Sequence, residues 1–226
     1  MVPGSFLARS VPIAAFGFAI AMIGSVILLV VPGPVSEDAY KAFLNDATKN
    51  IEVLIEELGL GERAYFFQTE RGEIRAFIPV SGASKEATVN WPPPYSLPLV
   101  GMESNHLVVD NGNQKGLLLI PPGAQLVKLA RLEKGEDLEM ALRSVLVESS
   151  AIASSVLAIE EKESKTIRVK IGKPAITWES SSLRQCLGSP SSCVASCVAA
   201  VVKGEAIRIL DEKLDSTKVL LSLEVI

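Results

Sequence analysis

Three cysteines, Cys186, Cys193 and Cys197, lie within twelve residues of one another and form the only cluster of reactive side chains in the sequence. Because Cys193 and Cys197 are four residues apart, a helix would place both thiols on one face, within reach of Cys186 on the preceding Ser-rich loop. Thiolates bind zinc and iron–sulfur clusters, but such sites normally have four protein ligands, and the sole histidine, His106, is distant in the sequence. The cluster is therefore a candidate metal, cofactor or redox site.

Two other interpretations of the cysteines stay open. In an oxidising compartment Cys186 could form a disulfide with Cys193 or Cys197, which would close the loop and leave one buried thiol. Alternatively, all three cysteines could be small core residues. We favour the disulfide over the metal site, because the spacing matches no standard metal motif.

Other motifs offer less chemistry. His106 has no nearby nucleophile pattern and is interpreted as structural. The run 92–95, Pro-Pro-Pro-Tyr, predicts a stiff polyproline loop. No glycine-rich segment has the spacing of a phosphate-binding loop. The net charge of −4 includes no basic cluster, which argues against nucleic acid as a partner. With no catalytic set in view, we expect a protein that is not an enzyme.

The elements that would position these residues follow from hydrophobic periodicity. An apolar stripe at steps of three and four predicts an amphipathic helix from Ser36 to Leu58. Strand-like runs separated by turn signals predict four hairpins, and apolar residues at helical spacing predict two helices over about 124–146. Residues 179–192 are Ser-rich and predict a loop, followed by a buried helix over 193–203. The four predicted hairpins pair 64–68 with 73–80, 106–110 with 116–120, 151–160 with 165–171, and 205–210 with 218–226.

A hydrophobic segment precedes this domain. Residues 11–31 contain no charge, and their length matches the hydrocarbon thickness of a bilayer, so we expect one uncleaved transmembrane helix. Arg9 before it, with Glu37 and Asp38 after it, favours a cytoplasmic amino terminus and a domain outside the cell membrane. Small residues at steps of four could let two such helices pair as a homodimer. These small residues are Gly17, Ala21 and Ser25.

The predicted fold class is accordingly α+β, with an N-terminal transmembrane helix followed by a mixed domain of β-hairpins packed with three to four helices. We expect three parts: the anchor over 1–34, an α+β soluble domain over 35–178, and a Cys-containing helix with a terminal hairpin over 179–226. The third part is expected to belong to the same domain as the second.

Two resemblances extend this prediction. The tail from Cys186 to Ile226, with cysteines entering an apolar helix and a final hairpin starting at Ala206, resembles the end of 4-vinyl reductase-type small-molecule-binding domains. That family's further cysteine and glycine in the last hairpin are replaced here by residues including Asp215, Ser216 and Thr217. The whole layout, with the Val-Pro-Gly-Pro run at 31–34 and the Leu-Leu-Ile-Pro-Pro-Gly run at 118–123, is similar to uncharacterised archaeal single-pass membrane proteins.

These resemblances imply a ligand-binding protein at a membrane and assign no activity. Our leading expectation is an anchored domain that binds a protein or a small ligand at the cell surface. The alternatives are a thiol or metal protein built on the three cysteines, and an assembly protein that dimerises through the transmembrane segment.

Overall fold

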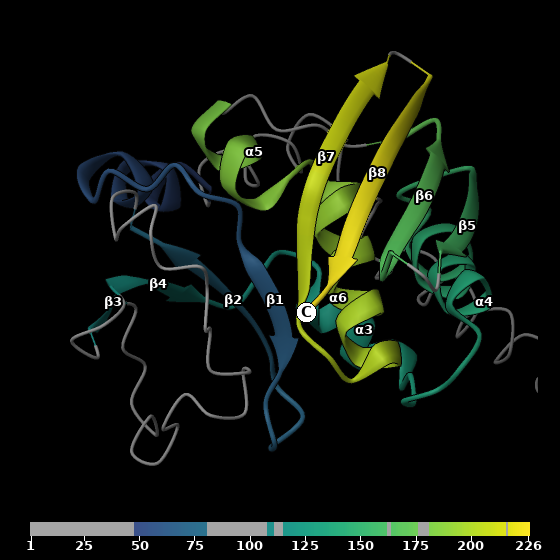
Figure 1. Ribbon diagram of the computed structural model, residues 1–226. Helices are drawn as coiled ribbons and strands as arrows, with labels where there is room; N and C mark the ends of the chain where they lie inside the picture. The colour runs from purple at the N-terminus through teal and green to yellow at the C-terminus, as the bar shows by residue number, and fades with distance from the viewer. Residues whose placement is uncertain (1–47, 81–107, 111–114, 162–163, 176–180, 216) are drawn as a thin grey trace, which may run out of the picture. The chain divides into compact units, whose positions relative to one another are not determined.

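A computed structural model describes residues 48–80, 108–110, 115–161, 164–175, 181–215 and 217–226. Residues 45–226 form one compact unit, and the description below is of this unit alone. Its main feature is a single antiparallel sheet of eight strands in the order β3-β4-β2-β1-β7-β8-β6-β5 (Figure 1). The strands are β1 (Tyr65–Gln68), β2 (Ile74–Pro79), β3 (Val108–Asp110), β4 (Lys115–Leu119), β5 (Ser155–Glu161), β6 (Thr166–Gly172), β7 (Ile207–Asp215) and β8 (Lys218–Val225).

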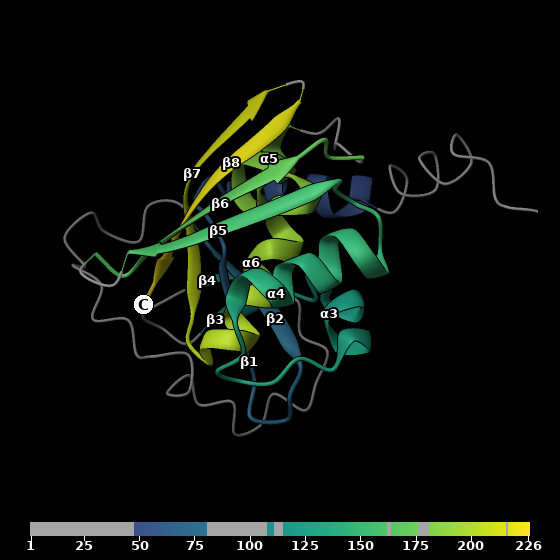
Figure 2. The same cartoon turned by 90° about the vertical axis from the view of Figure 1, so that its right-hand side faces the viewer.

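The described helices contribute to one core layer against this sheet. Figure 2 shows α3, α4 and α6 together on one side of strands β5 to β8. The helical elements are a helix over 48–57, α3 (Ala124–Ala130), α4 (Leu138–Arg143) with the π-helix η1 (Ser144–Ser149), α5 (Ser181–Leu187) and α6 (Pro190–Lys203). Buried apolar side chains from both layers form one large cluster between them.

The central helix α6 is enclosed by the rest of the unit. Its amino end has the residues that favour helix initiation, with Ser189 as the N-cap and Pro190 in the first turn, and Gly204 ends it in a left-handed conformation. Every residue from Pro190 to Val202 is buried. The prediction of a buried helix over 193–203 is therefore confirmed, and a helix that is apolar all round is the expected core element.

The predicted fold class is wrong in its arrangement, although the α+β mixture is present. Among the described residues, the one helical stretch long and apolar enough to cross a membrane is Ser181–Lys203, which is not N-terminal, and 94% of its apolar window is buried inside the unit. The hairpins are joined into one continuous sheet, because β1 pairs with β7, β2 with β4 and β6 with β8. Hydrophobic periodicity identifies neighbouring strands of a hairpin but not the strands that pair across larger separations.

The segment 11–31, with Gly17, Ala21 and Ser25, lies outside the described residues. So do the first part of the helix predicted from Ser36, the polyproline run at 92–95, and His106. The described residues do not test the predictions made for these segments.

The loop predicted over 179–192 is also wrong, because α5 occupies residues 181–187. Leu183, Cys186 and Leu187 are buried on this short helix. Its end is held to the segment before β1, where the Ala64 N–H donates to the Cys186 carbonyl at 2.9 Å and Gln185 Nε2 donates to the Gly61 carbonyl at 3.1 Å. These contacts join residues more than 120 positions apart, so the Ser-rich composition could not indicate them.

Candidate functional site

The three cysteines of the sequence-predicted site are all in the core. Cys193 and Cys197 lie one turn apart on α6, so their thiols are neighbours, as their spacing predicts. Cys193 Sγ also donates to the Pro122 carbonyl at 3.3 Å. Cys186 lies on α5 and donates to the Leu60 carbonyl at 3.7 Å. The thiols therefore have two different sets of backbone partners.

All three thiols are free and have no solvent exposure. Burial raises the pKa of Cys186 to about 11, and burial together with the neighbouring Cys197 thiol raises the pKa of Cys193 well above its ordinary value. A thiol of this kind is protonated at neutral pH, whereas nucleophilic and metal-binding cysteines react as thiolates. Within the part of the chain that the structure describes, no group of three or more His, Cys, Asp or Glu residues could hold a metal ion. The cysteine arrangement therefore contributes packing rather than an accessible reactive group.

A polar cluster at the start of α6 was not anticipated from the sequence. Glu212 of β7 accepts hydrogen bonds through its Oε1 from the Ser189 N–H, at 2.9 Å, and from the Ser192 hydroxyl. The Ser192 N–H donates to Ser189 Oγ at 3.3 Å, and Ser196 Oγ donates to the Ser192 carbonyl at 2.8 Å. The carboxylate thus satisfies donors at a helix end where negative charge is favourable.

A β-bulge accounts for the position of Glu212. The register of β7 against β8 shifts between Ile209 and Asp211, so that Glu212 is opposite the buried Leu221. Without the extra residue, Glu212 would fall on the other face of the sheet. The Ser189–Pro190 pair does signal a helix start, but no sequence signal marks the bulge. The position that an anionic ligand would take at this helix end is therefore filled by the protein's own carboxylate.

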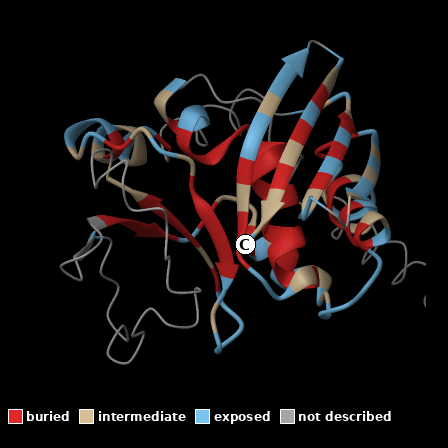
Figure 3. Cartoon of the chain, in the orientation of Figure 1, coloured by how far each residue is buried: buried red, intermediate tan, exposed pale blue. Residues whose placement is uncertain are grey.

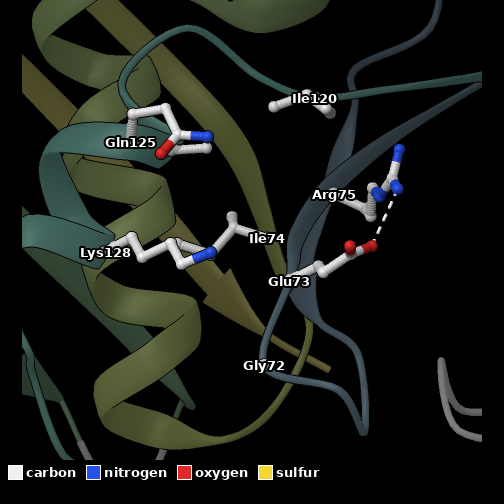
Figure 4. Close-up of a pocket in the computed structure, with 8 residues that line it drawn as sticks. Gly72, Glu73, Ile74, Arg75, Ile120, Gln125 and Lys128 are labelled. Carbon is white, nitrogen blue, oxygen red and sulfur yellow. Dashed lines mark hydrogen bonds and ion pairs between the residues drawn. The ribbon is translucent and has the colours of Figure 1, made fainter.

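A small pocket lies between β2 and α3. Its volume is about 70 Å³, which suits a few water molecules rather than an organic ligand. Figure 4 shows Gln125 and Lys128 of α3 extending toward Ile74, while Glu73 and Arg75 lie on the other side of the strand. Arg75 and Glu73 form an ion pair at 2.8 Å, and this hydrogen bond and charge lower the pKa of Glu73. The pair is intramolecular and the pocket is too small to support a cofactor site.

Another candidate surface is the outer face of β5, β6, β8 and β7, on the side away from the helices. Alternate residues of β6 point inward and outward, so Ile167, Val169 and Ile171 are buried whereas Arg168 and Lys170 are exposed. Figure 3 shows this alternation continuing along β8. No described helix packs on the outward side of these four strands (Figure 2).

Strand register arranges the outward residues in rows across the sheet. In one row Leu157 is opposite Lys170, Lys170 is opposite Leu220, and Leu220 is opposite Lys213. In the next row Ile159 is opposite Arg168, which is followed by Ser222 and Asp211. Neighbouring strands are about 4.8 Å apart, so these side chains form one contiguous surface. We call it the basic apolar face, and its residues are Leu157, Ile159, Arg168, Lys170, Asp211, Lys213, Leu220 and Ser222.

The basic apolar face combines exposed aliphatic groups with positive charge. Leu157, Ile159 and Leu220 are 47%, 55% and 41% exposed. Three of its residues are cationic and Asp211 is anionic, and Glu161 of β5, which pairs with Arg168, adds a second negative charge beside the face. Arg168 pairs with Glu161 at 3.0 Å and Lys213 lies 3.8 Å from Asp211, but both pairs are at the surface, where such contacts are weak. The face with its adjoining Glu161 therefore keeps a small excess of positive charge.

The outward side of the other half of the sheet is different. There, Tyr65 and Phe67 of β1, Phe77 of β2 and Leu118 of β4 form a second buried cluster with Ala206, which precedes β7. Phe67 and Phe77 are each 1% exposed. The same sheet thus buries its outward apolar residues in one half and exposes them in the other.

A comparison of the chain with protein-family models, with curated proteins and with solved structures found no significant match. The two resemblances noted from the sequence therefore stay predictions.

Proposed function

We propose that this protein is a binding protein held at a membrane by its hydrophobic segment 11–31, and that it contacts its partner through the basic apolar face. The observation that carries the proposal is the exposure of Leu157, Ile159 and Leu220 among basic residues on a sheet face that no described helix covers. Single exposed aliphatic residues are ordinary, but three in adjacent rows of one face form a patch, and apolar patches of this kind mark interaction sites.

The three apolar residues indicate how much binding free energy the face can contribute. Fully burying one such side chain contributes about 1.5–3 kcal/mol, and each of the three is roughly half exposed. Covering the remaining area would therefore contribute about 1 kcal/mol per residue, or about 3 kcal/mol for the patch. This is a weak interaction by itself, and it suits a protein that is already held close to its partner.

The larger hollows agree better with surface binding than with a small-molecule site. The hollow over the basic apolar face is about 370 Å³, another beside Arg63 and Arg184 is about 450 Å³, and a third beside α4 and β5 is about 580 Å³. All three are shallow and open to solvent at the surface, whereas small-molecule sites bury most of the ligand. We therefore favour a macromolecular or membrane partner, with apolar groups and negative charge, and no enzymatic reaction.

The side of the membrane on which the described unit lies is inferred from the charges around segment 11–31. Arg9 precedes the segment while Glu37 and Asp38 follow it, so we propose that the described unit faces outward. A membrane-impermeant maleimide applied to intact cells that carry Leu129→Cys tests this orientation, because Leu129 is 77% exposed. Labelling before lysis supports an outward unit, and labelling only after lysis contradicts it.

The proposed binding face is tested by the accessibility of Ile159→Cys in isolated native membranes and after solubilisation in mild detergent. A docked face should label slowly in membranes and rapidly in detergent. Leu129→Cys is a matched control, because it replaces an exposed aliphatic residue on α3 in the helical layer. The wild type should give little background, since its thiols are buried. Equal labelling of Ile159→Cys in both conditions would refute the proposed face.

A further inference from the structure

We infer that the basic apolar face lies on the anionic surface of the bilayer itself, so that the described unit docks on the membrane that holds it. This inference rests on the proposed function and names the partner of the same face.

The first argument is proximity. Sixteen residues, 32–47, lie between the hydrophobic segment and the first described residue. Even when fully extended, such a stretch spans at most about 55 Å. A tether this short gives an effective concentration on the order of millimolar at the bilayer surface, so weak contacts suffice for docking. Another protein would have to be present at a comparable local concentration to compete.

The second argument is the chemistry of the face. Leu157, Ile159 and Leu220 can enter the boundary between headgroups and acyl chains, since they project from a sheet rather than from a recess. Lys170 is opposite both Leu157 and Leu220 in the register, and Lys213 is also opposite Leu220. A lysine stem can lie along apolar groups while its ammonium reaches the phosphate level. This alternation of aliphatic and cationic groups fits a headgroup layer.

The third argument is the distribution of charge. A chain with net charge −4 is repelled from an anionic leaflet as a whole, yet the three cations of the basic apolar face still outnumber Asp211 and the adjoining Glu161. The field of an anionic leaflet attracts basic groups only within about one Debye length of its surface. The charge pattern therefore favours one orientation of the unit, with this face toward the lipid.

The test uses full-length protein purified and placed in lipid nanodiscs. One set of discs contains phosphatidylcholine alone, and the other contains about one third phosphatidylglycerol, which supplies the anionic surface. Maleimide labelling rates are measured for Ile159→Cys, with Leu220→Cys as a second position and Leu129→Cys as the control. In phosphatidylglycerol discs we expect the first two rates to fall by about fivefold or more, because docking removes the thiol from water. The control rate should stay the same.

Charge reversal separates electrostatic docking from other protection. In the Ile159→Cys background, the double substitution Lys170→Glu and Lys213→Glu should restore fast labelling in phosphatidylglycerol discs. Raising the salt concentration to about 0.5 M should act in the same direction, because it screens the attraction.

The remaining outcomes distinguish the inference from the function on which it rests. If Ile159→Cys is protected in native membranes but labels rapidly in both kinds of disc, the partner is a protein and the bilayer inference is refuted. Equal protection in both discs would refute the requirement for anionic lipid. Rapid labelling in native membranes and in discs alike would refute both the inference and the proposed face.

Discussion

Glu212 allows a quantitative test of how the fold is held together at the start of α6. In the structure its Oε1 accepts from the Ser189 N–H and from the Ser192 hydroxyl, and both serines are buried. Replacing Glu212 with alanine removes the acceptor and leaves both donors without it. Hydrogen bonds to a charged group contribute about 1.5–3 kcal/mol each when intact. Because Glu212 itself is partly exposed, we take the lower end for each and expect a loss of about 3 kcal/mol.

The conservative variant separates the acceptor from its charge. Glu212→Gln retains an amide oxygen at the same position, so it should cost only about 1 kcal/mol. Glu205→Ala provides a control of the same residue type at an exposed position near the end of α6, and it should change stability by less than about 0.5 kcal/mol.

The assay is equilibrium urea unfolding of the purified protein, followed by far-ultraviolet circular dichroism. With a denaturant slope of about 2 kcal/mol per molar, a loss of 3 kcal/mol lowers the urea midpoint by about 1.5 M. The reasoning is refuted if Glu212→Ala lowers the midpoint no more than Glu205→Ala does. It is also refuted if glutamine destabilises as much as alanine, because the acceptor would then be irrelevant.

Three further predictions concern the core and the sheet edge. Gly123 has a φ of +94°, and a Cβ there would lie 2.3 Å from Val194 Cγ2. Gly123→Ala should therefore destabilise the protein by about 2 kcal/mol or more in the same urea assay, and an unchanged urea midpoint would contradict this. Folding raises the pKa of Cys186 from an ordinary 9.0 to about 11, so the protonated thiol is favoured in the folded state. The free energy of unfolding should therefore fall by up to about 3 kcal/mol between pH 9 and pH 11, and Cys186→Ala should reduce that loss. At the edge strand β5, Glu139 accepts a hydrogen bond from the Ala158 N–H at 3.1 Å. Glu139→Ala should leave this backbone donor free and increase self-association measured by light scattering, and a monodisperse variant would contradict this.

The local elements were predicted from the sequence where two or more signals agreed. The hairpin of β1 and β2 forms around the predicted turn, and β5 with β6 and β7 with β8 pair as expected. The helices α3 and α4 both form within the range 124–146, where two helices were predicted. Periodicity and turn chemistry act over a few residues, and they were sufficient for elements of this size.

The features that were predicted wrongly or not at all depend on contacts between residues far apart in the sequence. The order of the eight strands is fixed by pairs such as β1 with β7, for which a single sequence has no signal. Helix α5 is stabilised by burial of Leu183 and Leu187, although its serines are typical of a loop. Tertiary burial outweighed local propensity there.

The chemistry of the candidate site could not be predicted from spacing for a related reason. Cys193 and Cys197 attracted attention because thiols are reactive, yet their chemistry depends on exposure, which spacing does not specify. Conversely, Leu157 and Leu220 looked like ordinary strand residues. Only the register and the uncovered outward side of the sheet bring them together with Lys170 as one surface.

The most direct measurement of membrane docking is quenching of a bimane fluorophore at Ile159→Cys by lipids that carry a nitroxide on the acyl chain near the headgroup. The full-length protein is placed in nanodiscs with phosphatidylglycerol, and Leu129→Cys carries the same fluorophore as the control. Docking through the basic apolar face predicts strong quenching at Ile159 and little at Leu129. Equal quenching at the two positions, or none at Ile159, would contradict it.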